Sequence, residues 1–137
     1  MQKEIKHTFY FSQSPEEIWN YLTKPELMEQ WLMPSDFQPV VGHHFRFTNP
    51  GGLTFTICEV LEVKPFTQLS YEWKNDWSKT KTPFTSKVTW TLTPMEGGTE
   101  LLLVHSGFEL FKDLTAHNGG WMFLCNKLGE ILKATAK

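Results

Sequence analysis

The chain has 137 residues and a formal net charge of −2, and its lysines and arginines form no cluster. We therefore expect one domain with one hydrophobic core, and no binding to nucleic acid or to an anionic membrane surface. No apolar run reaches the roughly 18 residues of a membrane span, and the first residues lack the apolar stretch of a secretory signal, so a cytoplasmic protein without membrane insertion is expected.

Aromatic residues make up 15% of the chain, with six Trp, eleven Phe and three Tyr. Most of them should belong to the core. A buried Trp or Tyr also needs a partner for its polar atom. A core this rich in Trp therefore favours a lined cavity over a fully apolar interior.

The first part of the chain predicts one strand followed by two short helices. Residues 5–11 are expected to form the strand. Ser14 is a suitable N-cap and Pro15 suits the first helical position, so a helix should run from there to the break at Lys24-Pro25. A second short helix is predicted from Pro25 to about Trp31, and the two helices form a hairpin.

Period-two alternation dominates the middle of the chain and predicts five consecutive strands joined by turns. The predicted strands cover residues 44–48, 54–63, 68–74, 84–93 and 99–108. A polar loop is predicted over residues 75–82. Grouped strands, rather than strands that alternate with helices, indicate an α+β domain with an antiparallel sheet.

A long amphipathic helix is predicted from about Asp113 onward, because apolar residues recur there three and four positions apart. Gly119 and Gly120 lie inside it, where each weakens a helix by roughly 1 kcal/mol relative to Ala. Close approach of another element is the expected reason for their presence.

Spaced motifs along nearly the whole chain resemble the activator of heat-shock-protein-90 ATPase homologue-like family, within the START-like helix-grip superfamily. These motifs occur in the order typical of that family. They are residues 14–19, 22–26, 60–65, 69–73, 97–101 and 105–108, followed by Gly120-Trp121.

The resemblance implies a helix-grip fold over residues 1–137. In this fold a curved antiparallel six-stranded β-sheet wraps around a long C-terminal α-helix, with two short helices between strands 1 and 2. It also implies a hydrophobic cavity that binds a lipid, a polyketide, a flavonoid-like or another apolar molecule, and a role in a stress response. The co-chaperone that gives the family its name has an additional N-terminal domain for its chaperone contacts, so small-molecule binding is expected here instead.

Nine residues are expected to line a cavity of order 300 to 1,000 Å³. They are Trp31, Trp73, Trp90, His105, Phe108, Trp121, Leu124, Cys125 and Leu128. Strand alternation places His105 on the same face as Leu101 and Leu103, with Leu102 and Val104 on the other face. His105 then either orients a ligand in the cavity or is a core histidine held by hydrogen bonds.

Two other functions stay open. The first is a cyclase-like or hydrolase-like enzyme in which His105, the one catalytic candidate, performs general acid–base catalysis with Glu109 or Asp113. The second is a stress protein that contacts a chaperone through an apolar patch around Leu102 and Val104 on the outer sheet.

No metal ion or cofactor is expected. His43 and His44 are adjacent strand residues that point to opposite faces, and no third ligand has a compatible spacing. Cys58 and Cys125 also lack the spacing of a zinc site, and both should be reduced, buried thiols. We expect a monomer or a weak dimer.

Overall fold

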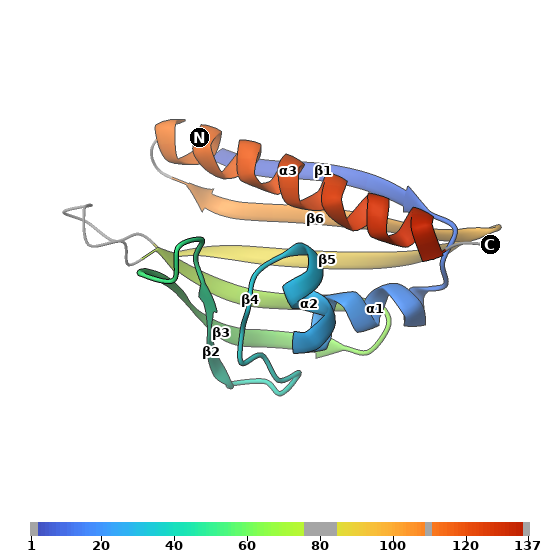
Figure 1. The fold of residues 1–137 in the computed structure, drawn as a ribbon, viewed down its shortest axis with the longest axis horizontal. Coiled ribbons are helices and arrows are strands. Elements are labelled where there is room, and N and C mark those ends of the chain that lie inside the picture. Colours follow the sequence, from blue (N-terminus) through green and yellow to red (C-terminus); the bar gives the residue numbers. More distant parts are fainter. Residues whose placement is uncertain (1–2, 76–84, 109–110, 136–137) are drawn as a thin grey trace.

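The computed structural model describes residues 3–75, 85–108 and 111–135, and within these ranges it has three helices and one six-stranded sheet (Figure 1). The predicted α+β helix-grip fold is confirmed. The predicted polar loop lies outside the described residues from position 76 onward. In chain order the elements are β1 (Lys3–Phe11), α1 (Pro15–Thr23), α2 (Pro25–Trp31), β2 (His44–Thr48), β3 (Phe55–Lys64), β4 (Gln68–Asn75), β5 (Thr85–Met95), β6 (Gly98–Phe108) and α3 (Phe111–Thr135).

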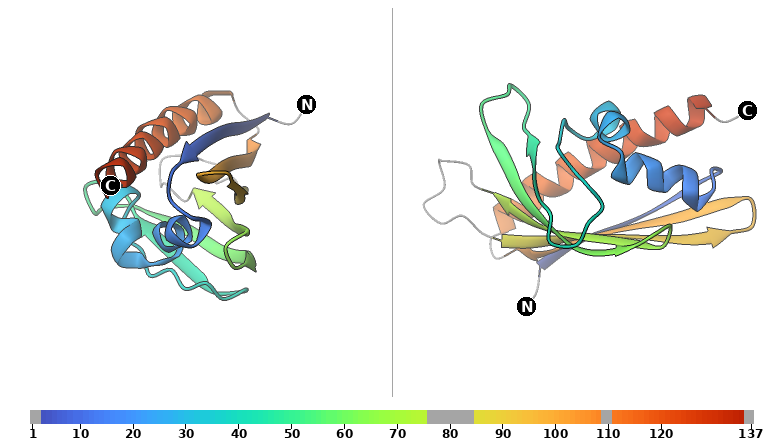
Figure 2. Two further views of the ribbon diagram at one scale, coloured as in Figure 1. Left: turned by 90° about the vertical axis from the view of Figure 1, so that its right-hand side faces the viewer. Right: turned by 90° about the horizontal axis from the view of Figure 1, so that it is seen from below.

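The sheet is antiparallel throughout, in the order β1-β6-β5-β4-β3-β2, so β1 and β2 form its two edges. All three helices lie on one face of the sheet, and β2 with the adjoining part of β3 rises on that side (Figure 2). Helix α3 runs along the β1 and β6 side of this concave face (Figure 1). The core therefore lies between the sheet, α3 and the pair α1 and α2.

The first helix begins as the sequence predicts. Ser14 Oγ accepts a hydrogen bond from the Glu17 backbone N–H, and the Glu17 carboxylate accepts one from the Ser14 N–H, both at 3.2 Å. This capping box satisfies two backbone donors that the first helical turn would otherwise leave unpaired. The buried face of the helix carries Ile18, Trp19 and Leu22, which anchors it on the sheet.

Strand β6 alternates as expected, with Leu101, Leu103 and His105 buried against α3. The predicted apolar patch on the outer face is wrong. Leu102 and Val104 are only half-exposed, because each lies between polar neighbours on β1 and β5. Leu102 is flanked by Thr8 and Thr91, and Val104 by Lys6 and Thr89.

The expected reason for the glycines of α3 is also wrong. A Cβ atom at Gly119 or Gly120 would meet no other atom within 4 Å, so no element approaches either residue closely. Both residues are exposed on the helix. Gly120 instead borders a pocket, and its missing side chain helps to leave that pocket open.

Candidate functional site

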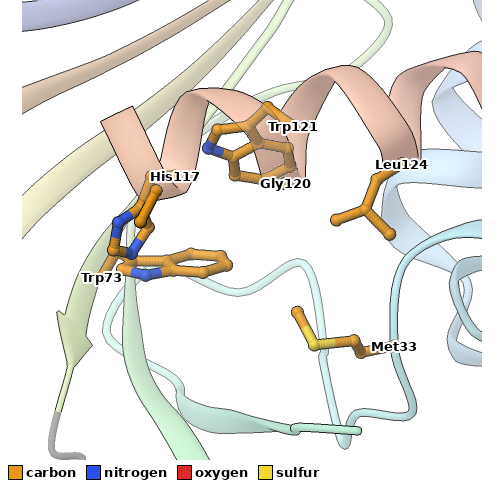
Figure 3. A pocket seen from close by; sticks show the side chains of 7 residues that line it. Met33, Trp73, His117, Gly120, Trp121 and Leu124 are labelled. Atoms are coloured by element: carbon orange, nitrogen blue, oxygen red, sulfur yellow. The ribbon is translucent and has the colours of Figure 1, made fainter. Parts of the chain in front are cut away.

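An apolar pocket of about 150 Å³ lies between α3, strand β4 and the segment after α2 (Figure 3). Met33 and Trp73 form one side. The other side belongs to α3. Its lining residues there are Ala116, His117, Gly120, Trp121 and Leu124.

The spacing of the α3 residues explains why they share the pocket. Ala116, Gly120 and Leu124 are each four positions apart, and His117 and Trp121 form a second row at the same spacing, so all five lie on adjoining strips of one helix face. Ala116 and Gly120 are exposed, and Trp121 is buried. The pocket thus has a rim of small residues and an aromatic interior.

Two indoles form the inner walls of the pocket. The ring centroids of Trp73 and Trp121 are 5.4 Å apart at an interplanar angle of 53°. Behind Trp121 lies Trp90, at 5.5 Å, and behind Trp90 lies Trp31, at 5.9 Å, both in edge-to-face geometry. The indole of Trp90 donates to the Tyr71 hydroxyl at 3.0 Å. The core therefore fills the space behind the walls and satisfies the polar atom of Trp90.

His105 is fully buried beneath these walls, and both of its ring nitrogens are hydrogen-bonded. Trp121 Nε1–H donates to Nδ1 of His105 at 2.9 Å. Nε2 of His105 lies 2.7 Å from Ser86 Oγ, and Ser86 Oγ–H donates to the Trp73 carbonyl oxygen at 3.1 Å. One chain of hydrogen bonds therefore connects the two tryptophans that form the pocket walls.

The hydrogen-bond donors around His105 fix the protonation state of its imidazole. An indole nitrogen can only donate, so Nδ1 of His105 must accept and the ring proton must sit on Nε2, which donates to Ser86. A second proton on Nδ1 would face the Trp121 N–H donor. Burial, and to a smaller extent the charge of His117, lower the pKa of His105 to about 2. His105 is a neutral core histidine.

This arrangement contradicts the catalytic role considered for His105. A general base needs an accessible lone pair and a pKa near the working pH, and His105 has neither. Its two expected carboxylate partners do not help. Glu109 lies outside the described residues, and the contact of Asp113 at this site is made by its backbone oxygen, which accepts a 2.8 Å hydrogen bond from Nδ1 of His117.

His117 is a titratable side chain in the lining of the pocket, and it was not among the residues predicted from the sequence. Its ring lies 5.5 Å from that of His105 and 5.1 Å from that of Phe108. Burial lowers its pKa, while the hydrogen bond to the Asp113 carbonyl opposes that shift. The signal was present in the sequence, because His117 precedes Trp121 by one helical turn.

Of the nine residues expected to line the cavity, Trp73, Trp121 and Leu124 border this pocket. The other six are buried in the core behind it, except that Cys125 also borders a groove on the opposite side of α3. These six are Trp31, Trp90, His105, Phe108, Cys125 and Leu128.

The volume of about 150 Å³ is smaller than the expected 300 to 1,000 Å³, so that expectation is wrong for this pocket. The physical reason is the aromatic content of the core. Trp31, Trp90 and Phe108 fill the space between sheet and helix with rings, and at most 3% of each side chain remains exposed.

Both cysteines are free and buried, as predicted, and burial raises the pKa of the Cys125 thiol to about 12. In the part of the chain that the structure describes, no three His, Cys, Asp or Glu side chains converge as metal ligands would. No helix there is both long enough and apolar enough to cross a membrane.

Comparison with known proteins gives a family match over most of the chain. The profile of the family described as Activator of Hsp90 ATPase homolog 1-like protein matches residues 12–133. No protein with a curated description matches the chain significantly.

Several solved structures share the fold. Protein MLL2253 from Mesorhizobium loti is 36% identical with a TM-score of 0.91, and the alignment covers 98% of this chain and 100% of that one. The Aha1 dimer from Colwellia psychrerythraea is 21% identical with a TM-score of 0.80, covering 95% of this chain and 96% of that one. CalU16 from Micromonospora echinospora is 20% identical with a TM-score of 0.80, covering 96% and 76%. The last two likenesses show the fold alone.

Proposed function

The chain belongs to the family of Activator of Hsp90 ATPase homolog 1-like proteins, and from this membership we propose that it binds a small aromatic or apolar molecule in the pocket between α3, Trp73 and Met33. The observation that carries the proposal is the pocket itself. It is apolar, it has two indole walls, and one imidazole, that of His117, lies at its lining. A mostly apolar cleft with one polar group to orient the ligand is typical of small-molecule sites.

The pocket volume narrows the ligand class. A closed apolar cavity of about 150 Å³ holds a molecule the size of benzene. A single-ring compound therefore fits the pocket as it stands. A lipid, a polyketide or a flavonoid-like molecule would need more room, which Met33 could provide because its unbranched side chain adapts easily.

Rigid walls support a binding role over a catalytic one. The hydrogen bonds from the Trp121 indole through His105 and Ser86 to the Trp73 backbone carbonyl fix the Trp121 indole and hold it to strand β4 before a ligand arrives. Preorganised walls lower the entropic cost of binding. The same bonds use both ring nitrogens of His105, so His105 has no free lone pair for acid–base catalysis. A cytoplasmic location forms part of the proposal, since Cys58 and Cys125 are unpaired thiols.

Blocking the pocket at Gly120 tests the proposal. We would titrate the protein with p-cresol as a one-ring probe and with 1-naphthol as a two-ring probe by isothermal titration calorimetry. Gly120→Leu adds a side chain at the pocket rim and should weaken p-cresol binding by about tenfold or more. The matched control is Gly119→Leu, which adds the same side chain one position earlier, outside the lining of this pocket.

The proposal predicts that Gly119→Leu binds p-cresol like the unchanged protein. Equal binding by both variants, or no saturable binding by the unchanged protein, would contradict it. Circular dichroism melts of both variants verify that the fold is retained.

A further inference from the structure

The two edge strands of the sheet, β2 and β1, differ in the partners of their outer backbone groups. At the β2 edge, a loop supplies backbone partners. The Arg46 N–H donates to the Asp36 carboxylate at 2.9 Å, the Thr48 N–H donates to the Pro34 carbonyl at 2.9 Å, and Ser35 forms a bridge with Phe47. At the β1 edge, the described residues form a sheet ladder with β6 on one side only.

Protection of the β1 edge is confined to its N-terminal half. The ladder shifts register between Lys3 and Glu4, Lys6 adds a charge, and Nε2 of His7 is hydrogen-bonded to the Asn118 side chain of α3 at 2.7 Å. Bulges, lysines and covering helices are the usual devices against unwanted strand pairing. Residues 8–11 have no register shift, no lysine and no proline.

The orientation of the backbone in this second half follows from Gly98. A Cβ atom there would collide with the Phe11 carbonyl oxygen, so that oxygen points toward β6. Backbone groups of successive residues in an antiparallel strand point alternately to the two sides. The N–H and C=O groups of Thr8 and Tyr10 therefore point away from β6, toward the open edge.

A groove adjoins these outward groups. It has a volume of about 540 Å³ and lies between residues 8–11 of β1 and residues 125–133 of α3. A second hollow of about 330 Å³ continues it past the end of β1, sharing Tyr10, Phe11, Gly129 and Lys133 with the first. We call the two together the β1–α3 groove, and it shares no lining residue with the pocket described above.

The walls of the groove combine an apolar surface with a neutral rim. Phe9 and Phe11 are half-buried, and their rings stack with centroids 6.4 Å apart. On the helix side, Gly129 leaves space, since a Cβ there would make only one ordinary contact, with the Phe11 ring at 3.8 Å. Glu130 and Lys133 supply one negative and one positive charge at the rim.

We propose that the β1–α3 groove binds an extended, uncharged peptide segment of a partner protein, which adds a strand to the sheet beside Thr8 and Tyr10. Outward backbone donors and acceptors are matched by main-chain groups in strand geometry, which only an extended polypeptide supplies. The phenylalanines favour an apolar side chain at every second position of the segment. The opposite charges of the rim favour neither an acidic nor a basic segment.

A second copy of the chain fits the groove less well. Two β1 strands that paired around a twofold axis would carry their α3 helices on the same face of the joined sheet. Each α3 already lies beside its own β1 at the groove, so the partner's helix would have to occupy the same narrow space. A free segment brings no helix with it.

The experiment uses a fluorescein-labelled hexapeptide of alternating Thr and Val, with blocked ends, titrated with the whole protein and followed by fluorescence anisotropy. We expect saturable binding. We also expect the amide hydrogens of Thr8 and Tyr10 to exchange more slowly with solvent when the peptide is bound. Gly129→Leu, which fills the groove, should weaken binding about tenfold. Gly119→Leu and Gly120→Leu are controls on the same helix and should leave the affinity within about twofold.

A second variant addresses the backbone directly. Tyr10→Pro removes the outward N–H but no hydrogen bond to β6, and prolines are tolerated at such edge positions. It should weaken peptide binding about fivefold or more while the melting curve stays cooperative. A peptide methylated on all of its backbone amide nitrogens should likewise bind about fivefold more weakly or worse.

Three results would overturn the proposal. One is the absence of saturable binding up to about 1 mM protein. Another is equal binding by Gly129→Leu and the unchanged protein. The last is a dimer in analytical ultracentrifugation that Tyr10→Pro converts to monomer, which would assign the edge to a second copy of the chain.

Discussion

The indole nitrogen of Trp121 donates a 2.9 Å hydrogen bond to Nδ1 of the buried His105, and this bond determines which nitrogen of the imidazole carries the proton. With Nδ1 accepting, the ring is neutral and its proton sits on Nε2, which faces Ser86. A residue that resembles a catalytic histidine in the sequence thus acts as a connector between helix α3 and the sheet.

The first prediction concerns pH. The pKa of His105 is about 2 in the folded protein and 6.5 ordinarily, so between these values the unfolded state binds a proton that the folded state does not. Stability is therefore lost as the pH falls below 6.5, at up to about 1.4 kcal/mol per pH unit. His105→Gln removes this titration. The free energy of unfolding of the unchanged protein minus that of His105→Gln, measured in urea, should decrease from pH 6.5 to pH 4.

Taking this difference cancels the contribution of the carboxylates and of His117, which both proteins share. A difference that stays constant between pH 4 and pH 6.5 would mean that His105 binds its proton equally in both states.

The second prediction concerns Ser86. Ser86→Ala removes the acceptor for His105 Nε2–H and the donor to the Trp73 carbonyl. A buried donor left without a partner costs about 1–3 kcal/mol. The control is Ser70→Ala, since Ser70 is also buried, on the neighbouring strand β4, and does not belong to the hydrogen bonds that join Trp121, His105, Ser86 and Trp73. Urea unfolding should show a larger decrease in the free energy of unfolding for Ser86→Ala than for Ser70→Ala. Equal decreases would contradict the structural role given to these hydrogen bonds.

Much of this fold could be predicted from sequence because its signals are local. The N-cap at Ser14, the break at Pro25 and the alternation through Leu101 and His105 each depend on neighbours a few residues away. The motifs of the family then placed these elements in one architecture. Predicted strand ends differ from the observed ones by one or two residues, as at β1 and β3, where side-chain patterning gives no sharp boundary.

The candidate site was less predictable because it depends on what fills the interior. Strand alternation placed His105 correctly on the inner face, yet it could not show that Trp121 and Ser86 use both ring nitrogens. The size of the pocket depends on how rings such as Trp90 pack, which is a property of rotamers. His117 could have been found by helical spacing, since it lies one turn before Trp121.

The third prediction concerns strain in the turn between β3 and β4. Phe66 adopts a φ of 65°, a left-handed conformation that is unfavourable for a residue with a side chain, while its ring packs edge-on against Trp19 with centroids 6.2 Å apart. Phe66→Ala loses the ring but keeps the strain. Phe66→Gly loses the ring and also the strain.

Thermal and urea unfolding should therefore show the Gly variant to be more stable than the Ala variant by about 1 kcal/mol. The reverse order would show that the turn relaxes out of the left-handed conformation when the ring is removed.

The central claim, that the pocket between Trp73 and Trp121 binds a small aromatic molecule, is tested most directly by the indole N–H signals of ¹⁵N-labelled protein. Assignment by single Trp→Phe variants identifies each signal. On saturation with p-cresol, the signals of Trp73 and Trp121 should shift progressively and together, while that of Trp19, which lies on the buried face of α1 beside Phe66 and does not line the pocket, stays in place. Shifts confined to Trp19, or no shift at Trp73 and Trp121 at any p-cresol concentration, would contradict the claim.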